Sequence, residues 1–168
     1  MNWEAISAIG EAIGALAVII TLAYLASQVR YARATANDTN RLTRVSGVRD
    51  VMLASATNDN LRNSITVGYG IEHYYEGFAQ AFEISAEDAG RLDYINLYYF
   101  WLHWGQFASS NSEKDTRELK RQITSFYRIP QVRYSWENSP WARPQLDHAF
   151  VEFVDGILSE SPVAQGDS

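Results

Sequence analysis

The sequence predicts an all-α protein: one N-terminal transmembrane helix that continues into a stalk, followed by a small helical bundle domain. Residues 6–26 are mostly apolar and carry one charge, Glu11, which predicts the membrane span. Beyond them, apolar residues recur at spacings of three and four, and no segment alternates apolar and polar residues as a strand does. With 168 residues, 46% of them hydrophobic, the chain can bury one ordinary core, and the absence of cysteine excludes a disulfide scaffold.

The transmembrane helix is assigned to residues 1–29. Because an α-helix rises about 1.5 Å per residue, residues 6–26 are long enough to cross a hydrocarbon core about 30 Å thick. Trp3 and Tyr24 flank this stretch, at positions where aromatic side chains anchor a span at the membrane interface. A buried core helix and a cleaved signal sequence pass the same length test and stay open as alternatives. A signal sequence normally opens with a basic segment, whereas the first charge here is Glu4.

The arginines indicate how the span is oriented. Residues 1–29 contain no Lys or Arg, whereas residues 30–49 contain five arginines and one acid. Basic residues beside a span are retained on the cytoplasmic side. We therefore expect a single-pass protein of the inner (plasma) membrane, with the N-terminus outside and the C-terminal domain in the cytoplasm. The side chains expected at the lipid head groups are Trp3, Tyr24, Arg30, Tyr31 and Arg33.

The rest of the chain is predicted as a basic juxtamembrane stalk helix over residues 30–57 and a helical cytoplasmic domain over residues 58–159. Asn58 can cap a short helix, which ends at the glycines around Tyr69. A second short helix carries four aromatic residues: Tyr74, Tyr75, Phe78 and Phe82.

Three further helices complete the predicted domain. Ser85 starts a long aromatic helix that ends near Ala108. Ser112 starts another helix, which Pro130 stops. The last helix holds Leu146, Phe150, Phe153, Val154 and Ile157, and Trp136 and Phe150 are expected in the core. Within the long helix, one face is formed by Leu92, Ile95, Tyr99 and Leu102. Residues 160–168 are predicted to be a disordered tail.

Several short motifs resemble a family of uncharacterised single-pass bacterial inner-membrane proteins. The N-terminal motifs are Trp3, a Gly-Glu-x-x-Gly element at residues 10–14, and Tyr-Leu-x-x-Gln-Val-Arg at residues 24–30. The second half is similar in its acidic helix start at Glu87-Asp88, its aromatic helix, the segment at residues 133–136, and Phe150. The stretch from residue 68 to 82 is longer than is usual in that family. The resemblance implies a single-pass membrane protein and brings no activity with it.

One face of the span carries small and polar residues. Glycines four residues apart let two helix backbones approach closely in a membrane. The residues expected at a helix–helix interface are Ser7, Gly10, Glu11, Gly14, Ala17 and Thr21. For Glu11, three roles stay open: a protonated or snorkelling carboxyl group near the outer interface, a hydrogen bond to a partner helix, or a place on an ion or proton path.

The chain carries no recognisable catalytic, metal-binding or cofactor motif. His73, His103 and His148 lack the spacing of metal ligands, and the sequence contains neither a P-loop nor a nucleophile motif. We therefore expect no enzyme activity, no cofactor and no metal. His103 is expected to be a core histidine rather than a haem or metal ligand. The aromatic residues 94–107 are expected to pack in the core, with a ligand pocket as the alternative.

These features predict a non-enzymatic, membrane-anchored helical protein that self-associates or serves as an accessory subunit of a membrane complex. The alternative is an oligomeric ion-conducting or sensing membrane protein with Glu11 at the helix interface. The expected partners are the lipid bilayer and either a second copy of the chain or a larger membrane complex. Nucleic acid is not expected, because the net charge is −6 and the basic residues lie beside the span.

Overall fold

A computed structural model describes residues 3–160, and all of its regular elements are helices, which confirms the all-α prediction. The helices are α1 (Trp3–Thr57), α2 (Asp59–Tyr69), α3 (Glu72–Phe82), α4 (Ala86–Ser109), α5 (Glu113–Phe126), α6 (Pro130–Asn138), the short 3-10 helix η1 (Arg143–Gln145) and α7 (His148–Glu160). Residues 161–168 of the predicted tail lie outside the described residues. Its first residue, Glu160, is the last residue of α7.

The chain divides into two units, Met1–Arg41 and Leu42–Ser168. The described part of the first unit is a single stretch of α1. The second unit contains the end of α1 and all the other helices. Gly47 does not break α1, because the helix is continuous across it.

Side-chain caps begin three helices of the second unit where the sequence predicts them. The Asn58 side chain accepts a hydrogen bond from the backbone of Leu61 (3.0 Å), and Ser85 accepts one from Asp88 (3.0 Å). Ser112 caps α5 in the same way. These contacts satisfy amide groups that a helix N-terminus otherwise leaves without a partner. At the other end of α2, Gly70 adopts φ +65°, a left-handed conformation that glycine takes without steric cost.

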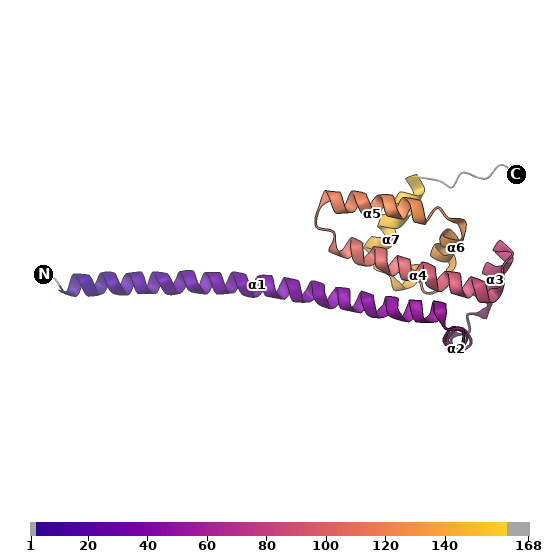
Figure 1. The fold of residues 1–168 in the computed structure, drawn as a ribbon. Coiled ribbons are helices and arrows are strands. Elements are labelled where there is room, and N and C mark those ends of the chain that lie inside the picture. The colour runs from indigo at the N-terminus through magenta and orange to yellow at the C-terminus, as the bar shows by residue number, and fades with distance from the viewer. Residues whose placement is uncertain (1–2, 161–168) are drawn as a thin grey trace. The chain divides into compact units, whose positions relative to one another are not determined.

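α4 is the central helix of the second unit and contacts α3, α5 and α6 (Figure 1). Its fully buried side chains include Asp93, Leu97 and Phe100. Ile95 and Tyr99, which belong to the predicted face formed with Leu92 and Leu102, are exposed. The side of α4 that carries Asp93, Leu97 and Phe100 is buried, whereas Ile95 and Tyr99 leave part of the helix surface open.

Two details of the second unit differ from the sequence-based prediction. Pro130 was predicted only to stop a helix. In the structure it is the first residue of α6, a helix that was not predicted. Proline fits the first position of a helix because the N–H that it lacks has no partner within the helix there. The last helix begins at His148, so Leu146 lies before it, although its side chain remains in the core.

Aromatic side chains dominate the core, as the sequence predicts. Trp136 and Phe150 are fully buried, which confirms their expected place. The ring of Trp136 lies edge-on to that of Phe100, with centroids 5.2 Å apart, and its indole N–H donates to Asp155 (2.9 Å). Gly105 allows α4 to lie close to α1, because a Cβ added there would be 3.2 Å from Val45.

Candidate functional site

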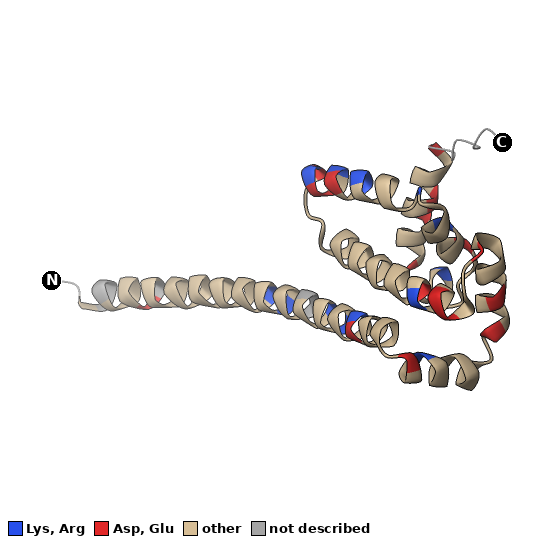
Figure 2. Ribbon diagram, turned by 45° about the vertical axis from the view of Figure 1, so that its right-hand side comes forward, with Lys and Arg blue, Asp and Glu red and all other residues tan. Residues whose placement is uncertain are grey.

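The apolar part of α1 is the first candidate site. Among the described helices, α1 alone is long and apolar enough to cross a membrane, judged by length and composition. None of its most apolar 18-residue window is buried against other parts of the protein. Figure 2 shows that this part of the helix is nearly free of charge and that arginines follow it along the same helix.

The predicted helix–helix interface residues all lie on this helix and are exposed: Ser7, Gly10, Glu11, Gly14, Ala17 and Thr21. A Cβ added at either glycine would meet no atom within 4 Å, so this surface is open. The Thr21 hydroxyl donates to the carbonyl of Ala17 (2.8 Å), so its proton is already used in a hydrogen bond within α1. The side chains predicted at the lipid head groups, Trp3, Tyr24, Arg30, Tyr31 and Arg33, are exposed as well.

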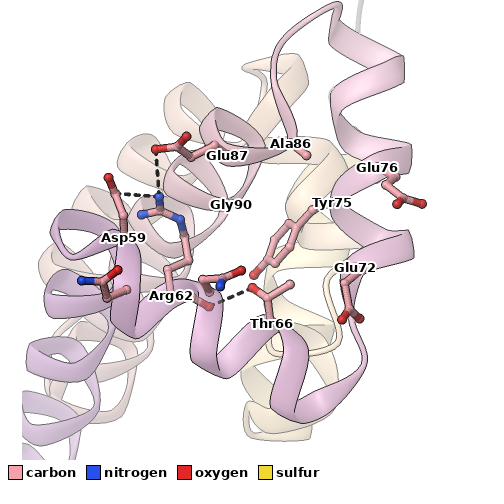
Figure 3. Close-up of a pocket in the computed structure, with 11 residues that line it drawn as sticks. Asp59, Arg62, Thr66, Glu72, Tyr75, Glu76, Ala86, Glu87 and Gly90 are labelled. Carbon is pink, nitrogen blue, oxygen red and sulfur yellow. Dashed lines mark hydrogen bonds and ion pairs between the residues drawn. The ribbon is translucent and has the colours of Figure 1, made fainter.

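A second candidate site is a pocket of about 530 Å³ between α2, α3 and the start of α4 (Figure 3). Four acidic side chains line it, namely Asp59, Glu72, Glu76 and Glu87. Arg62 is the basic residue of the lining, and Tyr75 contributes its ring. This pocket was not predicted, because its residues come from three separate helices.

Arg62 is buried beside the pocket and connects the helices around it. It is 96% buried, and its guanidinium donates to the carbonyls of Ser55 (3.2 Å) and Ala56 (3.4 Å) at the end of α1. The same group pairs with Asp59 at 2.7 Å and reaches Glu87 at 3.5 Å. A cation at a helix C-terminus offsets the partial negative charge of the last carbonyls. Arg62 therefore joins α1, α2 and α4.

Gly90 makes room for the Arg62 side chain. A Cβ added at Gly90 would be 3.0 Å from Cδ of Arg62, which is closer than nine in ten real Cβ contacts. Because the guanidinium is already fixed by its partners, the stem of the side chain has little freedom to move away.

Arg91 extends the ion pairs to the surface of the same region. Its guanidinium pairs with Asp59 (3.0 Å), Asp88 (3.3 Å) and Glu87. Hydrogen bonds from Arg62 and Arg91 lower the pKa of the Asp59 carboxyl group. These groups are exposed, so the network positions side chains and contributes little to the free energy of unfolding.

A buried carboxylate lies behind the pocket, at Asp93 in α4. The hydroxyl of Tyr74 donates to one carboxylate oxygen (2.7 Å), and the hydroxyl of Ser139 donates to the other (3.1 Å). Next to it, the Asn96 amide donates to Ser135 (2.9 Å). Burial raises the pKa of Asp93 to about 6, while the hydroxyl donors act in the opposite direction. Asp93 was not predicted as a site residue, although an acid among the aromatic residues of one helix is a signal that could have identified it.

His103 is buried in α4, as expected of a core histidine. Its Nδ1 has no hydrogen-bond partner among the described residues, and burial lowers its pKa to about 4. The imidazole is therefore neutral at physiological pH. Within residues 3–160, no group of three or more His, Asp or Glu side chains is placed to hold a metal ion.

Comparison with known proteins gives no assignment: no family model, curated protein or solved structure matches the chain. The resemblance to single-pass inner-membrane proteins therefore stays a prediction.

Proposed function

We propose that this chain is a membrane-anchored helical protein that acts by assembly, either with its own copies or as an accessory subunit of a membrane complex. The observation that carries the proposal is the fully exposed apolar window of α1. A helix with so much apolar surface is unfavourable in water, and lipid is the environment that removes it from water.

The topology that we propose has the N-terminus outside and residues 30–168 in the cytoplasm. The five arginines of residues 30–49 support this orientation, because a cluster beside a span is retained on the cytoplasmic side. The basic stalk and the helical domain then lie on the same side of an inner membrane. The lipid head groups contact the aromatic and basic side chains that flank the span.

Assembly is proposed to use the face with Gly10 and Gly14. Lipid tails are as apolar as the helix, so helix association depends on close packing and on interhelical hydrogen bonds. The open surface at these glycines admits a second backbone, and the Glu11 carboxyl group lies beside it.

A conducting or sensing oligomer is the second proposed function, because Glu11 is the one acid of residues 6–26. Carboxyl groups inside a membrane commonly serve ion or proton transfer. The two proposals differ in what Glu11→Gln does, since an amide preserves a hydrogen bond and removes the charge.

Membrane anchoring is tested with two matched leucines of α1. Leu16 lies at the centre of the proposed span and Leu42 beyond it, and both are exposed. Leu16→Lys is expected to release the chain from membranes in alkaline carbonate, because a central lysine opposes insertion by about 3 kcal/mol. Leu42→Lys is expected to leave the chain in the membrane fraction. Release of the unchanged protein by carbonate, or equal behaviour of both variants, contradicts the anchor.

A further inference from the structure

The outer face of α5 carries a line of basic side chains. Lys114, Arg117 and Arg121 follow one another at helical spacing, opposite the buried Leu119 and Ile123. Lys120 lies at their edge, and Arg128 follows in the turn after α5. These five residues, named here the basic stripe, line an open hollow of about 770 Å³ together with Thr124 and Ser125.

The basic stripe contrasts with the rest of the second unit. Five of the nine basic residues after residue 50 belong to it, although the same part of the chain contains 16 acids. Lys120 pairs with Glu160 (2.7 Å) and Arg117 with Glu113 (3.3 Å). Within the described residues, Lys114, Arg121 and Arg128 lie within ion-pair distance of no acid. Three cations are thus available to an anionic partner.

An apolar groove adjoins the basic stripe. Arg121 and Ser125 line both the basic hollow and a neighbouring groove of about 660 Å³ between α4 and α5. The groove exposes the side chains of Tyr99 and Ile129, and its polar lining includes the acid Glu118 as well as Arg121. An amphiphilic anion needs a cationic surface for its charge and an apolar surface for its hydrocarbon. The basic stripe and the neighbouring groove provide these two surfaces side by side.

We infer that the α4–α5 face binds anionic phospholipid, with the basic stripe at the phosphate groups and the neighbouring groove at the upper acyl chains. This inference rests on the proposed membrane anchor, because an anchored domain is held near lipid head groups. Arginine and lysine near an anionic membrane contribute about 1 kcal/mol each. The apolar part of the groove favours an occupant that has hydrocarbon beside its charge, which phospholipid has and a purely acidic segment lacks.

The absence of cysteine allows a local test in the full-length chain. Ser125→Cys places an environment-sensitive fluorophore between the two surfaces, and Ser64→Cys places the same probe on exposed α2, far from the stripe in sequence. Each labelled protein is incorporated into lipid discs of phosphatidylcholine alone or of equal parts phosphatidylcholine and phosphatidylglycerol. The emission maximum and the quenching by iodide are measured at low and high salt.

The probe at position 125 is expected to shift to the blue and to lose iodide quenching in phosphatidylglycerol discs, and high salt reverses both changes. The probe at position 64 is expected to give the same spectrum in both discs. Arg121→Gln with Arg128→Gln should abolish the shift, since each lost charge weakens lipid contact roughly fivefold. Arg133→Gln, which removes a cation paired with Glu137 in α6, should leave it unchanged.

Each other outcome overturns the inference. Equal spectra in the two discs show that the stripe does not contact anionic lipid. A shift produced by added polyglutamate, and not by phosphatidylglycerol, assigns the stripe to an acidic protein partner. Co-elution of the chain with the discs is recorded separately, so failure of the anchor is distinguished from failure of the lipid contact.

Discussion

The hydroxyl of Tyr74 in α3 donates a 2.7 Å hydrogen bond to the carboxylate of Asp93, which is fully buried in α4. Ser139 supplies the second hydroxyl donor (3.1 Å). A buried carboxylate held by neutral donors alone is costly to ionise, and burial accordingly raises its pKa to about 6. The contact joins three segments of the second unit and makes its stability dependent on pH.

Protonation of Asp93 should increase the free energy of unfolding as the pH falls. Since its pKa is higher in the folded state than the usual 3.8, folding binds a proton between about pH 4 and pH 6, and the free energy of unfolding rises as the pH falls through that window. The difference corresponds to roughly 3 kcal/mol. Asp93→Asn keeps the hydrogen-bond acceptor for Tyr74 and removes this contribution. Denaturant unfolding at several pH values, followed by tryptophan fluorescence, should show the variant losing more stability in acid than the unchanged protein.

His103 should oppose Asp93 over the same range. Its pKa is lowered from 6.5 to about 4, so the unfolded chain binds the proton, and the free energy of unfolding falls as the pH drops below 6.5. His103→Phe retains a ring beside Phe126 and Tyr127 and removes the titration. The same unfolding series should show this variant gaining stability in acid relative to the unchanged protein. Parallel pH profiles for the two proteins would rule out a buried neutral imidazole.

Gly90→Ala should destabilise the second unit despite the higher helix propensity of alanine. The new Cβ meets the stem of Arg62, and such overpacking costs about 1–3 kcal/mol. Gly156→Ala in α7 is the matched control, because a Cβ there meets nothing within 4 Å. That control should gain up to about 1 kcal/mol. Thermal unfolding of both variants provides the comparison, and a stabilised Gly90→Ala would contradict the close approach of Arg62.

The small-residue face of the span should control assembly. Gly14→Leu fills the space that a second helix would occupy, so crosslinking in membranes should decrease, whereas Gly47→Leu, at an equally open glycine beyond the span, should have no effect. Glu11→Gln should preserve crosslinking, and Glu11→Ala should weaken it by about 0.6–2 kcal/mol. If Glu11→Gln abolishes ion flux while crosslinking persists, the conducting function is supported. Unchanged crosslinking and flux in all the span variants would place the interface elsewhere.

Local signals explain how much of the fold could be predicted. Asn58, Ser85 and Ser112 cap helices through hydrogen bonds to residues three positions away, so the sequence alone indicates where those helices start. α6 was missed because Pro130 suits both the end of one helix and the first turn of the next. No local pattern separates these two roles.

The contacts of the polar sites join residues that are distant in the sequence, so these contacts could not be predicted. Asp93 receives its hydrogen bonds from Tyr74 and Ser139, which are 19 and 46 positions away. Arg62 and Gly90 meet because two helices cross, and neither residue has a motif that indicates it. The long apolar helix could be predicted because hydropathy and charge are properties of consecutive residues, and the residues concerned all lie along α1.

The central claim is that residues 6–26 cross a membrane with the N-terminus outside, and cysteine labelling in intact cells tests it most directly. The chain has no cysteine, so Asn2→Cys and Ser168→Cys each introduce a single site. A membrane-impermeant maleimide should label Asn2→Cys in intact cells and Ser168→Cys only after the cells are permeabilised. Labelling of Ser168→Cys in intact cells, or of neither site until permeabilisation, would contradict the account.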